Sequence, residues 1–278
     1  MEVVQTLESL RRWRATTHRS VGLVPTMGFL HEGHLALVRR ARAENDIVAV
    51  SIFVNPRQFG PDEDLARYPR NKERDLALLR DESVDLVFLP TVDEMYPAGF
   101  STTVDVGLLG KRLEGVSRPD HFKGVATVVA RLLNLTRPQR AYFGQKDAQQ
   151  VVVVRRMVKD LALTAQIDAV PTVREPDGLA LSSRNIFLSI EEREAATALS
   201  RALFRAQESF EWGERNANRL RQIVRDMLDL ELLVRTDYVS VADASTLDEL
   251  DLIDRPALLS LAAWVGHTRL IDNVPLEV

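Results

Sequence analysis

The residues VGLVPTMGFLHEGHLALVRRA (21–41) decide the fold. The first four form an apolar run that predicts a buried strand, and residues 35–43 carry apolar side chains at helical spacing. A glycine-containing turn, residues 25–34, lies between them. A strand that leads through such a turn into a helix presents backbone N–H groups at the helix N-terminus, and these suit an anionic ligand.

The alternation of strand and helix continues through the first two-thirds of the chain. Short apolar runs predict further strands at 46–54, 84–89, 140–143 and 165–173. Helical patterns lie at 7–13, 72–82, 125–133 and 147–161. This order predicts an α/β fold with a Rossmann-like, doubly wound parallel sheet.

The pattern changes after about residue 175. Long helical stretches, 191–210 and 216–230, precede two strand-like runs, 237–241 and 257–265. We therefore predict a nucleotide-binding catalytic domain over 1–175 and a smaller C-terminal α+β domain over 176–278.

Composition excludes several classes of protein. The 278 residues include 36 basic and 40 acidic side chains, a net charge of -4, and no cysteine. Cysteine chemistry, disulfides and thiolate metal sites are therefore absent. A dedicated nucleic-acid binder would carry a basic excess, which this chain lacks.

No apolar run approaches the ~20 residues of a membrane span. The N-terminus lacks the pattern of a signal peptide, so we expect a cytoplasmic protein without nucleic-acid or membrane partners.

The glycine-containing turn over residues 25–34 holds two histidines. His31 and His34 are three residues apart, so both imidazoles should point the same way, and Gly33 lets a bulky group approach the backbone. Together they could hold a triphosphate. Two surface histidines beside a turn, or a metal half-site completed by His121 and carboxylates, are the alternatives.

Three other loops carry polar side chains suited to a ligand. In YFGQKDAQQ (142–150), Lys146 is a point charge and Gln150 offers a donor and an acceptor. In DGLALSSRN (177–185), the Ser-Ser-Arg run suits phosphate oxygens. Asn55 and Gln58 could orient a small polar substrate. Taken singly, each loop is equally compatible with an ordinary turn or helix cap.

Together these stretches resemble the pantoate–β-alanine ligase family of the class I nucleotidylyltransferase superfamily. The resemblance covers nearly the whole chain and rests on five motifs in order: PTMGFLHEGH (25–34), FVNPRQFGPDEDLARYPR (53–70), RPDHFKGVATVV (118–129), YFGQKDAQQ (142–150) and DGLALSSRN (177–185). It implies ATP-dependent condensation of (R)-pantoate with β-alanine through a pantoyl adenylate. The products would be pantothenate, a precursor of coenzyme A, with AMP and diphosphate. The resemblance also implies Mg²⁺ with ATP and a homodimer.

The resemblance also implies roles for individual residues. His34, His31 and Lys146 would be catalytic, and Gln58 and Gln150 would bind substrate. The ATP site would comprise Met27, Gly28, Phe29, Leu30, His31, Glu32, Gly33, His34, Gly144, Gln145, Lys146, Asp147, Val173, Leu181, Ser182, Ser183 and Arg184. The metal ligands are not assigned, although Asp75 is a candidate.

Two positions depart from the family pattern. Leu181 stands where methionine is common, a near volume-conserving change. Asp120 replaces a glycine, and aspartate would be strained there if that position needs a positive φ, so the role of His121 is open.

Two other functions compete with the one that the resemblance implies. One is adenylylation of a phosphorylated acceptor, and the other is a non-catalytic nucleotide-binding or RNA-binding module that has kept the fold.

Overall fold

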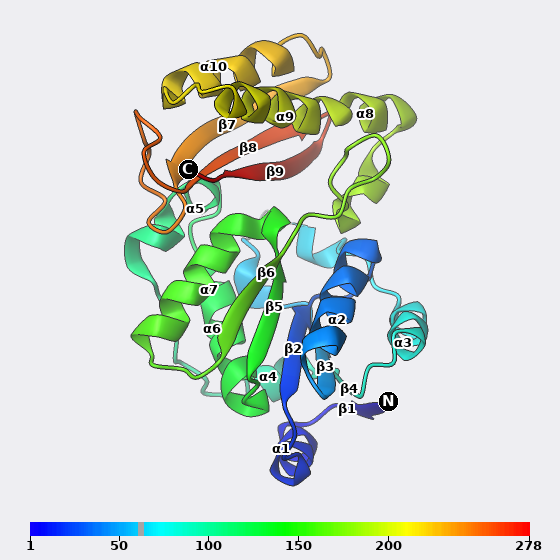
Figure 1. Ribbon diagram of the computed structural model, residues 1–278. Helices are drawn as coiled ribbons and strands as arrows, with labels where there is room; N and C mark the ends of the chain where they lie inside the picture. The colour runs from blue at the N-terminus through cyan, green and yellow to red at the C-terminus, as the bar shows by residue number, and fades with distance from the viewer. Residues whose placement is uncertain (61–63) are drawn as a thin grey trace. The chain divides into compact units, whose positions relative to one another are not determined.

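The computed structural model describes residues 1–60 and 64–278, so positions 61–63 of the 53–70 motif lie outside the described residues. The described chain divides into two compact units (Figure 1). The first comprises residues 1–144 and 149–171, and the second comprises 145–148 and 172–278. The domain boundary at 175/176 stays a prediction. Within the described ranges, no helix is long and apolar enough to span a bilayer.

The first unit contains a six-stranded sheet in which every recorded pairing is parallel. Its strands are β1 (Glu2–Val4), β2 (Val21–Thr26), β3 (Ile47–Ile52), β4 (Leu86–Phe88), β5 (Arg140–Gly144) and β6 (Gln166–Val170). They lie in the order β1-β4-β3-β2-β5-β6. The predicted Rossmann-like parallel sheet is confirmed.

Helices cover both faces of this sheet (Figure 1). One face packs against α1 (Leu7–Thr16), α6 (His121–Thr136) and α7 (Ala148–Asp160), and the other against α2 (Glu32–Glu44) and α3 (Lys72–Asp81). Alternate residues of a strand point to opposite faces, so Leu23 joins the first apolar cluster and Val24 the second. Burial on both faces explains the continuous apolar runs of these strands.

The strand order places two predicted motifs side by side. β2 pairs with β3 on one side and with β5 on the other, so the chain order reverses between β2 and β5. In doubly wound sheets, ligands bind beyond the carboxyl ends of the strands at this reversal. The 25–34 motif follows β2, and Gly144 ends β5.

The remaining segments of the first unit are short. They are η1 (Pro56–Gln58), η2 (Asp64–Ala66), α4 (Val92–Met95), η3 (Gly107–Lys111) and α5 (Glu114–Ser117).

The second unit is an antiparallel sheet, β7 (Val234–Asp243), β8 (Ala257–Val265) and β9 (Thr268–Leu276), with helices packed against it. Its apolar core joins these strands to α9 (Thr197–Glu211) and α10 (Ala217–Leu228). The unit also holds η4 (Gln145–Asp147), η5 (Ser183–Phe187) and α8 (Ile190–Ala195). The predicted helix over 191–210 is interrupted at Ala196, and neither β1 nor β9 was predicted from the sequence.

Candidate active site

The turn after β2 has an unusual backbone. Gly28 and Phe29 both have positive φ, +87° and +50°. At Gly28 a Cβ would lie 2.9 Å from Ile52 Cγ2 and 3.1 Å from Asp75 Oδ2, so glycine is required for space as well as for conformation. Thr26 Oγ1 accepts a hydrogen bond from Gly28 N at 3.2 Å and donates one to Ser51 O at 2.9 Å. The chain thus leaves the strand in a fixed, strained direction.

Two neighbouring side chains of α3 hold this turn. The carboxylate of Asp75, whose residue is 1% exposed, accepts hydrogen bonds from Phe29 N and Leu30 N, both at 2.8 Å. Arg74 Nη1 donates to Leu30 O at 2.8 Å, and its guanidinium lies 5.4 Å from the Phe29 ring centroid. Both carboxylate oxygens of Asp75, the candidate metal contact, therefore bind the backbone of the turn.

The two histidines form a reciprocal cap at the start of α2. His31 is the N-cap residue and not part of the helix, and its Nδ1 accepts from Gly33 N at 3.2 Å. His34 Nδ1 accepts from His31 N at 3.3 Å. The ring centroids are 4.1 Å apart, as expected from their spacing. Because each Nδ1 is an acceptor, the proton of each neutral ring is on Nε2, which makes Nε2–H a donor.

Gln58 ends the short helix η1 and is held by its neighbours. Asn55, which is buried, donates from Nδ2 to Gln58 Oε1 and to Gly124 O, both at 3.1 Å. Gln58 Nε2 lies 3.0 Å from Met27 Sδ, so the structure brings these two predicted site residues together. A Cβ on Gly124 would lie 2.1 Å from Arg57 O, so only glycine lets α6 approach η1 this closely.

His121 contacts the backbone of Gln58. Its Nδ1 lies 2.8 Å from Gln58 O, which requires the proton on Nδ1. Arg118 donates to the same oxygen from Nη2 at 3.2 Å, and its Nη1 lies 3.2 Å from His121 Nε2. Asp120 has φ -103°, so aspartate causes no backbone strain there. His121 therefore positions Gln58 from the start of α6.

Neighbouring glutamines in α7 differ in their surroundings. Gln149 is buried: its Oε1 accepts from Glu114 N at 3.1 Å, and its Nε2 donates to Leu109 O and Arg112 O at 2.9 and 2.7 Å. Gln149 therefore stabilises the backbone of the 109–114 segment. Gln150, the predicted substrate ligand, is half-buried.

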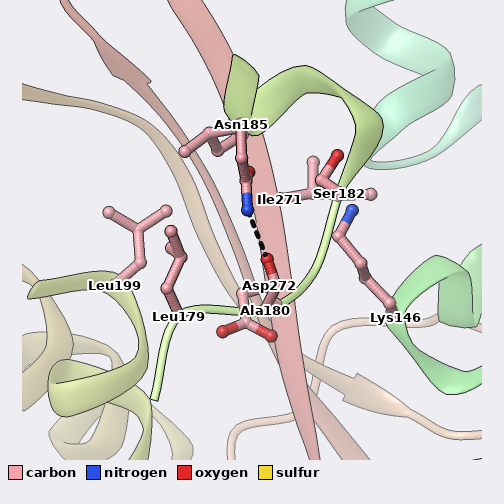
Figure 2. A pocket seen from close by; sticks show the side chains of 9 residues that line it. Lys146, Leu179, Ala180, Ser182, Asn185, Leu199, Ile271 and Asp272 are labelled. Atoms are coloured by element: carbon pink, nitrogen blue, oxygen red, sulfur yellow. Dashed lines mark hydrogen bonds between the residues drawn. The ribbon is translucent and has the colours of Figure 1, made fainter. Parts of the chain in front are cut away.

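The second unit carries the other predicted nucleotide contacts. Gln145, Lys146 and Asp147 form η4, and Asp147 is exposed. Lys146 and Ser182 line one pocket of about 10 Å³, the space of a single water molecule (Figure 2). Leu181 N donates to Val173 O at 3.0 Å, so these two predicted contacts are adjacent.

The predicted site residues thus fall into two groups. The first unit holds the 27–34 turn, Gln58, Gly144 and Gln150, and the second holds 145–147, Val173 and 181–184. Sequence reasoning missed the residues that hold these segments, because each partner is distant in the chain. Among the described residues, no cluster of three or more His, Cys, Asp or Glu side chains could hold a metal ion.

Comparisons with known proteins agree with one family. A family model described as pantoate-beta-alanine ligase matches residues 2–275. The chain is 61% identical over 277 residues to the pantothenate synthetase of Roseiflexus castenholzii, and the match covers 100% of both chains. The pantothenate synthetase structure from Thermus thermophilus has a TM-score of 0.96, 50% identity and 100% coverage of both chains. A Francisella tularensis pantoate-beta-alanine ligase, complexed with beta-gamma ATP and beta-alanine, has a TM-score of 0.82 at 34% identity, with 99% of this chain and 97% of that chain covered.

Replacement of Asp75 should destabilise the first unit. In Asp75→Asn an amide N–H₂ would face a backbone N–H, so one donor loses its acceptor and the charge-assisted bonds are lost. We expect a loss of about 1.5–3 kcal/mol in the free energy of unfolding, measured by denaturant titration. Asp81→Asn removes the same charge from an exposed position of α3 and should change little. Equal stability of the two variants would contradict this account of the turn.

Proposed function

We propose that this chain, which belongs to the pantoate–β-alanine ligase family, condenses (R)-pantoate with β-alanine through a pantoyl adenylate. The chain is an enzyme of this ligase class, and its biosynthetic product is pantothenate. The family match over residues 2–275 carries the proposal, because it covers all five sequence motifs. The geometry of the 27–34 turn supports the adenylation step.

In the first step, a carboxylate oxygen of pantoate attacks the α-phosphorus of ATP. A new P–O bond forms, the bond to the bridging oxygen breaks, and diphosphate leaves with the electron pair. The protein does little covalent work in such a transfer, so positioning and charge stabilisation set the rate. We assign the Nε2–H groups of His31 and His34, with the N-terminus of α2, to hydrogen bonds with ATP phosphate oxygens.

Charge on the transferred phosphate calls for cations. We assign this task to Lys146, with Ser182, Ser183 and Arg184 as further phosphate ligands. The remaining ATP contacts predicted from the sequence stay part of this proposal: residues 27–30, 32, 33, 144, 145, 147, 173 and 181. Lys146 and Ser182 line one pocket of the second unit, so their side chains lie near one another, which supports a common role at the phosphates (Figure 2).

In the second step, the amine of β-alanine attacks the activated carbonyl. The C–N bond forms, the amine gives up a proton, and AMP leaves with the electrons of the acyl–oxygen bond. Gln58 and Gln150 would hold pantoate by its hydroxyl and carbonyl groups. The fixed backbone of Gln58, held by His121 and Arg118, supports an orienting role.

Magnesium would enter with ATP. Mg²⁺ prefers phosphate oxygens, water and one or two carboxylates, so a substrate-borne ion needs no preformed protein cage. Bound in this way, Mg²⁺ would supply positive charge to the phosphates. The carboxylate of Asp75 already accepts two backbone hydrogen bonds, so we do not assign it as a ligand. A homodimer in the cytoplasm completes the proposal.

The proposed reaction predicts which substrates the formation of AMP requires. We expect AMP to form only when ATP, pantoate and β-alanine are all present in a steady-state assay. Pantoate alone should support isotope exchange of diphosphate into ATP, because adenylation is reversible before the amine arrives. Formation of ADP, or exchange that does not need pantoate, would contradict the adenylate mechanism.

His34 variants can separate capping from catalysis. In His34→Asn the side-chain oxygen can still accept from His31 N, whereas the Nε2–H donor is lost. We expect kcat to fall by about 10²–10³ with an unchanged melting temperature, because one donor to the transition state is removed. His34→Ala should lose both kcat and stability. Full activity of His34→Asn would remove the Nε2–H group from the mechanism.

Lys146→Ala should lower kcat by about 10²–10³ if the ammonium stabilises charge that develops in the transition state. A raised KM for ATP with an unchanged kcat would instead mean that Lys146 binds the ground state. Lys159→Ala, at the end of α7, is the control for loss of a lysine outside the site. Steady-state rates at varied ATP distinguish these outcomes.

A further inference from the structure

Asn273 in β9 contacts the turn that carries Lys146. The residue is 4% exposed. Its Nδ2 donates to Gln145 O at 3.0 Å and to Lys146 O at 2.9 Å, and its Oδ1 accepts from Gln145 Nε2 at 3.1 Å. One buried amide therefore fixes two consecutive backbone carbonyls of η4, and a short turn of three residues has few other means of holding a shape.

The preceding residue of β9 holds a second segment. Asp272, which is 3% exposed, accepts from Arg174 Nη1 at 2.6 Å and Nη2 at 2.9 Å. Arg174 Nη1 also donates to Gly178 O at 3.1 Å, and Arg174 forms an antiparallel bridge with Ala180. This bidentate ion pair anchors the base of the hairpin that leads into residues 181–184.

Asp272 and Asn273, adjacent in β9, thus hold two segments of the second unit: η4, which carries Lys146, and the hairpin that leads into residues 181–184. The pocket lined by Lys146, Ser182 and Asp272 lies beside them (Figure 2). A lysine side chain has many rotamers, so the place of its ammonium depends on how firmly its backbone is held. The backbone ladder between β8 and β9 would form without an amide at position 273, so the amide serves the turn.

We propose that Asn273 is a positioning residue for the reaction, which sets the place of Lys146 relative to the 181–184 segment that the Asp272–Arg174 pair anchors. The inference rests on the proposed function, in which Lys146 neutralises phosphate charge. Electrostatic stabilisation requires charges that are placed before the reaction begins, so a displaced ammonium lowers the rate of adenylation.

A double-mutant cycle tests this inference through diphosphate–ATP exchange in the presence of pantoate. We expect Asn273→Ala to lower the maximal exchange rate by about 10- to 100-fold, with little change in KM for ATP. In the Lys146→Ala background the same substitution should change the rate by less than about threefold, because there is no ammonium left to position. Asn273→Asp keeps the shape and loses both donors, so it should repeat the loss if the alanine variant folds poorly.

Ser260→Ala is the matched control. Ser260 lies opposite Asn273 in the β8–β9 register, it is buried, and its Oγ has no hydrogen-bond partner among the described residues. It should keep the parental rate.

The outcomes separate the inference from its premise. Wild-type exchange in both Asn273 variants, or losses that multiply with Lys146→Ala, would overturn the positioning role alone. Wild-type exchange in Lys146→Ala would overturn the role of Lys146 in the proposed function.

Discussion

The buried carboxylate of Asp75 holds the turn that carries the predicted site residues 27–34 of the first unit. The positive φ of Phe29 costs energy, and leaving the N–H groups of Phe29 and Leu30 without acceptors would cost more. The carboxylate satisfies both groups, and Arg74 satisfies the carbonyl of Leu30. The start of α2, and with it the histidine cap, is fixed by these contacts.

The same physical arrangement recurs around other segments that carry predicted site residues. A buried or half-buried polar side chain from a distant element binds the backbone of a short turn, and that turn carries the predicted site residue. His121 and Arg118 bind the carbonyl of Gln58, and Asn273 binds the carbonyls beside Lys146. In the proposed function, rigid backbone at these points reduces the conformational entropy that substrate binding would otherwise have to overcome.

Sequence patterns predicted the parallel sheet, both sets of helices and the proximity of His31 to His34, because periodicity and short-range spacing encode these features. They could not predict the contacts that hold the turns. Asp75 and Phe29 are 46 residues apart, and Asn273 and Gln145 are 128 apart. The three residues of β1 are too few for a pattern, and polar Asp272 and Asn273 obscure β9. Those same polar residues are the ones that bind Arg174 and η4.

The assignment of residues 145–148 to the second unit has a consequence for exchanging parts between relatives. The chain passes from one unit to the other at 144/145, 148/149 and 171/172. A chimaera joined at a single point near 171 would combine the Lys146 turn of one parent with the β9 strand of the other. Such a hybrid inherits a mismatched pair of contact surfaces, so a workable exchange must transplant the tetrapeptide 145–148 together with the C-terminal unit.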